Sequence, residues 1–191
     1  MLAPGLPLAL SRAYDSRNTN RAGCLGKGWT ASWDQPGLQL ASGLAGNWVE
    51  AGMAGAMFGV KCNIAEGASH LATVTLPGGG AAYFAARLTA EAGAIPLDGG
   101  ASVTLDFPPA ARGQGTLRCN GTDKLGGLGV AVVAGSGQND DWSWSGAPLR
   151  LIPSWDDTSG QDFVPSGFDY LAPDGTDYVF AQPADAAHTT W

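Results

Sequence analysis

The chain has 191 residues, of which 45% are apolar and only 14% are charged, and its formal net charge is -7. Its 10 Lys and Arg residues are spread along the chain, which argues against a phosphate-binding surface and against nucleic acid or an anionic membrane as partner. The 29 glycines and 12 prolines argue against a helical bundle and favour an all-β fold with many turns. No apolar run reaches the roughly 18 residues that a transmembrane helix needs, and no signal peptide is visible.

The first predicted element is a pair of strands within residues 5–33. Apolar and small residues alternate over 6–14, and Trp29 and Trp33 share one face of a second period-2 pattern. The connection between them is polar, and Gly26 and Gly28 flank Lys27 just before the tryptophan. We therefore expect an antiparallel pair joined by a long loop.

The order of residues in this stretch also carries a family resemblance. It resembles the pattern G-x-P-[LIV]-x-[LIV]-x-R-x-Y-x-S…G-x-[FL]-G-x-G-W, which is typical of the N-terminal segment of the RHS (YD-repeat) proteins. The matching positions are Gly5, Pro7, Arg12, Tyr14, Ser16, Gly23, Gly26, Gly28 and Trp29. Two hairpin-like sequences at 74–84 and 170–180 are similar to the "TxPDGxxxxF" hairpins of that family, whereas tandem YD repeats are absent from this chain.

The resemblance implies a part of a large extracellular, secreted or cell-surface protein. Such proteins, often bacterial, build β-rich shells that enclose a variable C-terminal toxin, or act at cell contacts. The toxin and its cleavage site would lie far downstream, so the resemblance supplies no catalytic residue here. It implies that Arg12, Tyr14, Gly26, Gly28 and Trp29 form the fold, and that the partners are the rest of the parent chain and a cell-surface glycan or protein.

Along the rest of the chain, alternation and turn residues predict a series of short strands. They are expected at residues 38–40, 69–76, 81–88, 102–107, 116–119, 128–134, 149–152, 168–171 and 178–181. Residues 77–80 and 173–176 are strong turns, so the strands on either side of each should form hairpins. Residues 48–58 could form a short helix, although Gly52 and Gly55 each cost about 1 kcal/mol there.

These elements predict an all-β fold of mostly antiparallel hairpins, arranged as a sandwich or as an open, shell-type sheet. We expect a single β-rich unit over 1–191, part of a larger protein. Its subdivisions are an N-terminal hairpin (1–40), central hairpins (69–134) and a terminal hairpin (147–183).

No motif for nucleophilic catalysis is present. The two histidines, His70 and His188, lack a GxSxG or SxxK partner, and His188 lies three residues from Trp191, where fraying is expected. Paired carboxylates at Asp140-Asp141 and Asp156-Asp157 could serve a glycosidase-like hydrolase, but adjacent loop aspartates are more often turn features. We predict that the chain is not an enzyme.

Cysteine and carboxylate spacing gives no metal motif. Cys24, Cys62 and Cys119 are odd in number and widely spaced, so neither a disulfide framework nor a zinc site is indicated. Two oxygen-rich loops could hold calcium, at Asn139-Asp140-Asp141 and at 156–162, yet neither follows the spacing of a calcium-binding loop. We expect no cofactor.

Tryptophan is the one residue type whose abundance suggests a ligand, since there are seven. Trp142, Trp144 and Trp155 lie in loop-like sequence, where exposed indoles could stack on sugar rings. The sequence thus leaves two functions open: a structural scaffold segment of an RHS-like protein, and a carbohydrate-binding β-sandwich module.

Overall fold

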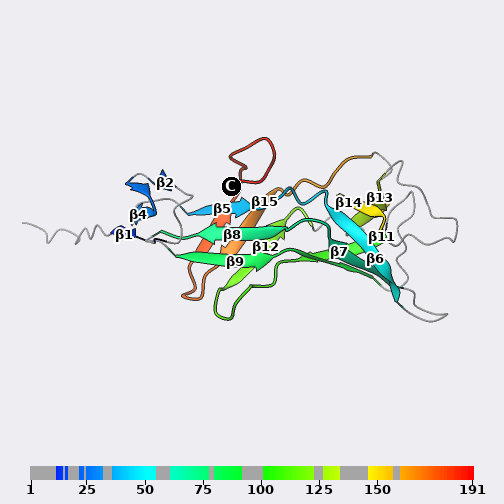
Figure 1. Cartoon of the computed structure of the whole chain (residues 1–191), viewed down its shortest axis with the longest axis horizontal. Helices are drawn as coiled ribbons and strands as arrows, with labels where there is room; N and C mark the ends of the chain where they lie inside the picture. Colours follow the sequence, from blue (N-terminus) through cyan, green and yellow to red (C-terminus); the bar gives the residue numbers. More distant parts are fainter. Residues whose placement is uncertain are drawn as a thin grey trace, which may run out of the picture.

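The computed structural model describes residues 12–14, 16, 22–23, 25–31, 36–54, 61–77, 80–91, 101–122, 127–133, 146–156 and 160–191. Within these ranges every regular element is a β-strand, and every pair of neighbouring strands runs antiparallel. The structure therefore confirms the all-β, antiparallel fold predicted from the sequence. Figure 1 shows two main sheet units side by side along the long axis of the molecule.

The first unit is a sandwich of two three-stranded sheets. One sheet has the order β5 (Gly37–Leu40), β8 (Leu71–Thr75), β9 (Ala81–Ala85), and the other has the order β12 (Thr116–Asn120), β15 (Gly167–Leu171), β16 (Asp177–Phe180). Buried and less buried residues alternate along these strands, because successive side chains of a strand point to opposite faces. The predicted hairpins β8–β9 and β15–β16 are both present.

Both edges of the β5–β8–β9 sheet are covered by other parts of the chain. On the β5 edge, Leu38 N–H donates to Trp191 O at 2.9 Å, and Trp191 N–H donates to Leu38 O at 2.8 Å. On the β9 edge, Ala85 N–H donates to Pro108 O, and Ala110 N–H donates to Tyr83 O. In the facing sheet, β16 is an edge strand whose partner is β15.

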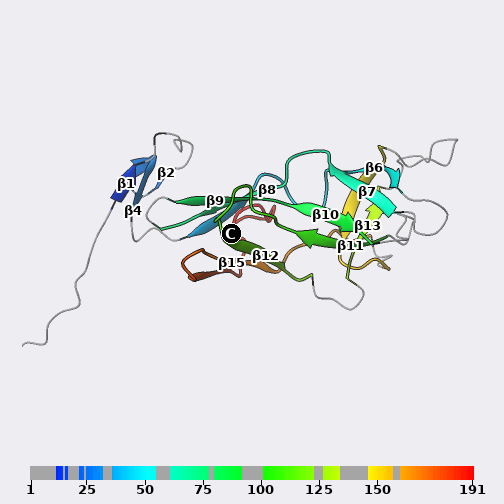
Figure 2. The same cartoon turned by 90° about the horizontal axis from the view of Figure 1, so that it is seen from below.

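The second unit is a six-stranded sheet that curls on itself. Its order is β10 (Arg87–Ala90), β11 (Ala101–Asp106), β13 (Leu128–Val132), β14 (Pro148–Ile152), β6 (Trp48–Ala54), β7 (Lys61–Glu66). The two outermost strands, β10 and β7, contact each other, so the sheet is almost closed. Figure 2 shows β10 and β11 extending away from the sandwich into this unit.

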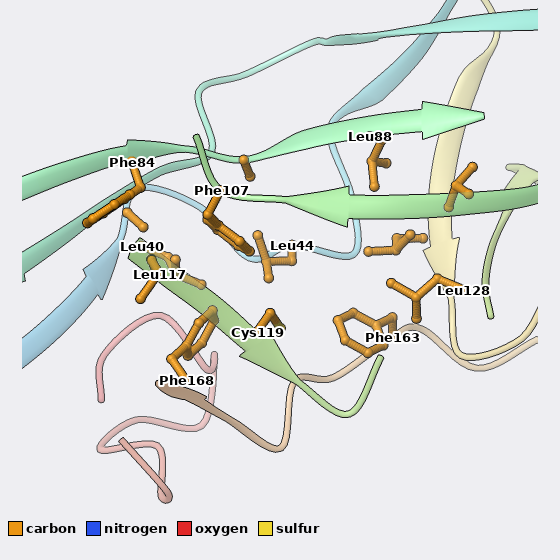
Figure 3. Packing of buried hydrophobic residues seen from close by; sticks show 14 of the residues in the cluster. Leu40, Leu44, Phe84, Leu88, Phe107, Leu117, Cys119, Leu128, Phe163 and Phe168 are labelled. Atoms are coloured by element: carbon orange, nitrogen blue, oxygen red, sulfur yellow. The ribbon is translucent and has the colours of Figure 1, made fainter. Parts of the chain in front are cut away.

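One hydrophobic cluster runs through both units. In the sandwich, Phe84 packs edge-on against Tyr170 with 5.8 Å between ring centroids, and Phe168 packs edge-on against Phe107 and Trp191. Figure 3 shows the cluster continuing past Cys119 and Phe163 toward the second unit. Burial of each such large side chain contributes about 1.5–3 kcal/mol, so this shared core holds the two units together.

The N-terminal stretch forms a separate hairpin. β1 (Arg12–Tyr14) pairs with β4 (Trp29–Ala31), and the shorter β2 (Ala22–Gly23) pairs with β3 (Gly26–Lys27). The predicted antiparallel pair is therefore present over these residues, and in Figures 1 and 2 it lies beside the sandwich. The positions predicted before residue 12 lie outside the described residues.

Three local predictions are wrong. The helix expected at 48–58 is strand β6 over its described part, because Trp48 and Glu50 alternate inward and Gly52 has a φ of 109°, which no α-helix allows. The single strand expected at 81–88 is interrupted at Ala86, where β9 of the sandwich gives way to β10 of the curled sheet. The chain around His188 is not frayed, since Trp191 is paired with β5 and buried.

Candidate functional site

His70, one of the two buried polar side chains of the described residues, lies where the chain crosses between the two sheet units. We call this place the joint and define it as residues 41–47, 67–70 and Ala86. Its segments are linked by backbone hydrogen bonds: Gly67 N–H donates to Asn47 O at 2.6 Å, and Ala86 N–H donates to His70 O at 3.2 Å. The loop 41–47 leads from β5 to β6, and 67–70 leads from β7 to β8.

His70 lies at the centre of the joint. Its side chain is 0% exposed, and its ring stacks on the indole of Trp48 with 4.0 Å between centroids and 2° between the planes. His70 Nε2–H donates to Gly46 O at 2.8 Å, while Nδ1 is buried without a hydrogen-bond partner. Burial lowers the pKa of His70 from its ordinary value, against smaller opposing effects of the Gly46 carbonyl and the Glu66 carboxylate.

The indole of Trp48 is itself fixed by the joint. Trp48 Nε1–H donates to Leu44 O at 2.7 Å, which satisfies the only polar group of a side chain that is 1% exposed. The His70 ring is thus held between a fixed indole and the chain crossing. Neutral imidazole, with one N–H and one bare nitrogen, is the form that fits this enclosure.

Glu50 is a second buried polar side chain, on the same face of β6 as Trp48. It is 1% exposed, its Oε1 accepts a hydrogen bond from Gly52 N–H at 2.9 Å, and its Oε2 has no partner. The register of β6 and β7 shifts between Glu50 and Met53, so the carboxylate caps a β-bulge. Sequence reasoning missed Glu50. The sequence does show that Glu50 lies two residues after Trp48, which places both side chains on one face of an otherwise apolar strand.

The residues that carry the RHS-like pattern come together as one packed hairpin. Tyr14 lies opposite Trp29 in the register, with ring centroids 5.1 Å apart, and the guanidinium of Arg12 lies 5.2 Å from the Trp29 ring centroid. Gly26 and Gly28 have φ values of 105° and 75°, which side chains other than glycine adopt only with strain. The described residues of the motif therefore pack against one another within the hairpin.

The described cysteines are unreactive, buried thiols. Cys62 and Cys119 are both free, and burial raises the pKa of Cys62 to about 11 and that of Cys119 to about 12. A thiol with so high a pKa is protonated near neutral pH and is a poor nucleophile and metal ligand. Cys24 lies outside the described residues.

Of the three tryptophans predicted to contact glycan, only Trp155 lies in the described part of the chain. It follows β14 and is 46% exposed, whereas Trp142 and Trp144 lie outside the described residues. Elsewhere, on β14 itself, Arg150 donates to Gly160 O at 2.7 Å and to Asp162 Oδ1 at 3.4 Å. An exposed indole can stack on a sugar ring.

The carboxylates considered for calcium or hydrolysis are not assembled into a site where they are described. Asp156 accepts a hydrogen bond from Ser154, and Asp162 pairs with Arg150. Asp140, Asp141 and Asp157 lie outside the described residues. Across the described ranges no group of three or more His, Cys, Asp or Glu residues could hold a metal ion.

A shallow groove runs along the outside of the junction between β11 and β12. A hollow of about 380 Å³ is lined by both Arg87 and Arg118, and an adjoining one of about 450 Å³ includes Asp169. The charges alternate, because Arg87 lies opposite Asp106 in the strand register and Arg118 lies opposite Asp169. The groove therefore has no excess charge that would select an ionic ligand.

Comparison with known proteins gives one match. A family described as "Domain of unknown function (DUF6531)" matches residues 1–49, a segment that includes the N-terminal hairpin and the strand β5. No curated protein and no solved structure matches the chain. In the ranges that the structure describes, no helix has the length and apolarity needed to cross a membrane.

Proposed function

We propose that this chain is a structural segment, without catalysis of its own, of a large secreted or cell-surface RHS/YD-repeat protein. The observation that carries the proposal is the N-terminal hairpin. There the RHS-like motif residues of β1 and β4 pack on one another. The family match over residues 1–49 supports it, since domains of that family often occur in RHS proteins.

The sandwich supports a role as part of a larger β-sheet shell. Strand β16 has β15 on one side, and its Val179 is 65% exposed. Leu171, on the neighbouring strand, is 48% exposed. An edge strand with exposed apolar side chains is a template for pairing with another strand, and in a shell the adjacent part of the wall would occupy it.

The proposal is tested by the association of the isolated 191-residue chain. Analytical ultracentrifugation over a hundredfold range of concentration should show self-association. Val179→Lys should weaken it, because a charge on an edge strand opposes edge-to-edge pairing. Val164→Lys, a change at another exposed apolar residue outside the strands, is the matched control and should leave association unchanged. A wild-type chain that stays monomeric with a sharp cooperative thermal transition would contradict the proposal.

A second candidate function is carbohydrate binding, which the exposure of Trp155 favours. In this function the indole, with Trp142 and Trp144 as further candidates, stacks on the sugar rings of a surface polysaccharide. Titration of soluble polysaccharides against tryptophan fluorescence separates the two functions. Quenching that Trp155→Ala removes would support the binding module, and unchanged fluorescence across the panel would refute it.

A further inference from the structure

The joint couples a titratable group to the contact between the two sheet units. His70 is the residue before β8 of the sandwich, its ring stacks on β6 of the curled sheet, and its carbonyl accepts the Ala86 N–H at the second crossing. Any movement that exposes the ring to water must break the Trp48 stack and the bond to Gly46 O. The state of this one imidazole is therefore linked to whether the joint is closed.

The surroundings of the ring accept a neutral imidazole better than an imidazolium. Because Nε2–H already donates to a carbonyl, a proton would add at Nδ1, which is buried without a hydrogen-bond partner. From β7, the facing carboxylate is Glu66, whose Oε1 lies 3.8 Å from Nδ1 and whose side chain is 37% exposed.

The other elements around the ring bring little compensating charge. From β6 the ring meets the indole of Trp48. The next inward residue of that strand is Glu50, whose Oε1 accepts Gly52 N–H, and the carboxylate that acts on the pKa of His70 is that of Glu66 and not of Glu50. Loop 41–47 contributes a carbonyl, and the crossing at Ala86 contributes a backbone N–H. Protonation would thus place a positive charge in an enclosure where only a partly solvated carboxylate offsets the lost hydration.

We propose that the joint is an acid-sensitive latch between the two sheet units: it is closed while the His70 ring is neutral and opens when the ring takes up a proton. The open state exposes the imidazole to water and frees the Ala86 and Gly67 N–H groups. The opening is confined to the joint, because the hydrophobic cluster shared by the two units still holds them together and the pairing of β5 with Trp191 lies outside the joint.

The sign and size of the effect follow from proton linkage. In the closed state the pKa of His70 lies below its ordinary value of 6.5, and in the open, hydrated state it is ordinary. Well above pH 6.5 the ring is neutral in both states, so pH has no effect on the latch. Below pH 6.5 the open state binds a proton that the closed state does not, so the open fraction rises by up to about tenfold per pH unit until the closed-state pKa is reached.

Hydrogen exchange of individual amides tests the latch on the whole chain. Protection factors, corrected for the intrinsic rate, should fall by up to about fivefold between pH 6.5 and 5.5 for the Gly67 and Ala86 amides, because the exposed ring is already half protonated at pH 6.5. The amides of Leu38 and Trp191, which pair outside the joint, serve as internal reference and should not change. An equal fall at all four amides, or no fall at the first two, would overturn the proposal.

Variants assign the effect to the ring. His70→Gln, whose amide can still donate to Gly46 O, should remove the pH dependence, and His188→Gln, a change at the other histidine, should retain it. Glu66→Gln removes the carboxylate that favours the protonated ring, so it should open the joint further at pH 5.5. Dependence that survives His70→Gln would overturn the proposal. If that variant does not fold, a nuclear magnetic resonance titration showing an ordinary or raised pKa for His70 would overturn it instead.

Discussion

The register of strand β9 makes a sharp prediction, because two adjacent aromatic residues point to opposite faces of its sheet. Phe84 is 0% exposed and packs against Tyr170, whereas Tyr83 is 41% exposed. Phe84→Ala should cost about 4 kcal/mol, the middle of the range for a fully buried phenylalanine. Tyr83→Ala should cost about 1 kcal/mol or less, since it removes mainly surface contacts and some strand propensity.

The assay is urea unfolding followed by tryptophan fluorescence and by circular dichroism. With a slope of about 2 kcal/mol per molar urea, the Phe84 variant should shift the midpoint by about 2 M and the Tyr83 variant by about 0.5 M. The difference of about 3 kcal/mol is the quantity to compare, because unfolded-state effects are similar for two neighbouring aromatic-to-alanine changes. Equal costs, or a larger cost at Tyr83, would refute the sandwich packing and the strand register together.

Three further predictions use other parts of the structure. Gly115→Ala should destabilise the protein by roughly 2–4 kcal/mol in urea unfolding, because its Cβ would lie 2.2 Å from a carbonyl oxygen of β15. Gly113→Ala has a similar positive φ but open space around it, so it should cost only about 1 kcal/mol, and equal costs would contradict the close approach. With the remaining cysteine replaced by serine, the Cys62 and Cys119 thiols should react with a thiol reagent at pH 8 only after unfolding, and rapid native labelling would disprove their burial. Hydrogen bonds from the threonines near the C-terminus lower the pKa of Asp185 below its ordinary value of 3.8. Protection of the amides that donate to Asp185 should therefore persist at neutral pH and be lost in acid, as the pH falls from 3.8 through the lowered pKa. Asp185→Asn should abolish this acid dependence.

Local patterns predicted the hairpins but not where their strands would go. The alternation and turns around 77–80 and 173–176 predicted β8–β9 and β15–β16, because a short hairpin is specified by neighbouring residues. The interruption at Ala86 could not be predicted from the sequence, because buried and more exposed residues continue to alternate through it into β10. Only the distant partners of the two strands differ, and period-2 patterning does not encode a partner.

The joint could not be predicted for the same reason. His70 and Trp48 are far apart in the sequence, and their stacking depends on the crossings between two sheet units. Glu50 conflicts with the expectation that inward strand positions are apolar. The bulge that its carboxylate caps is the physical reason for the exception.

The measurement that tests the central proposal most directly is the sequence of the gene beyond the codon for Trp191. If this chain is a scaffold segment of an RHS/YD-repeat protein, the reading frame continues into tandem repeats of the form GxxxxYxYDxxGRL, followed by a variable C-terminal region. A reading frame that closes without such repeats, or continues into an unrelated domain, would contradict the proposal.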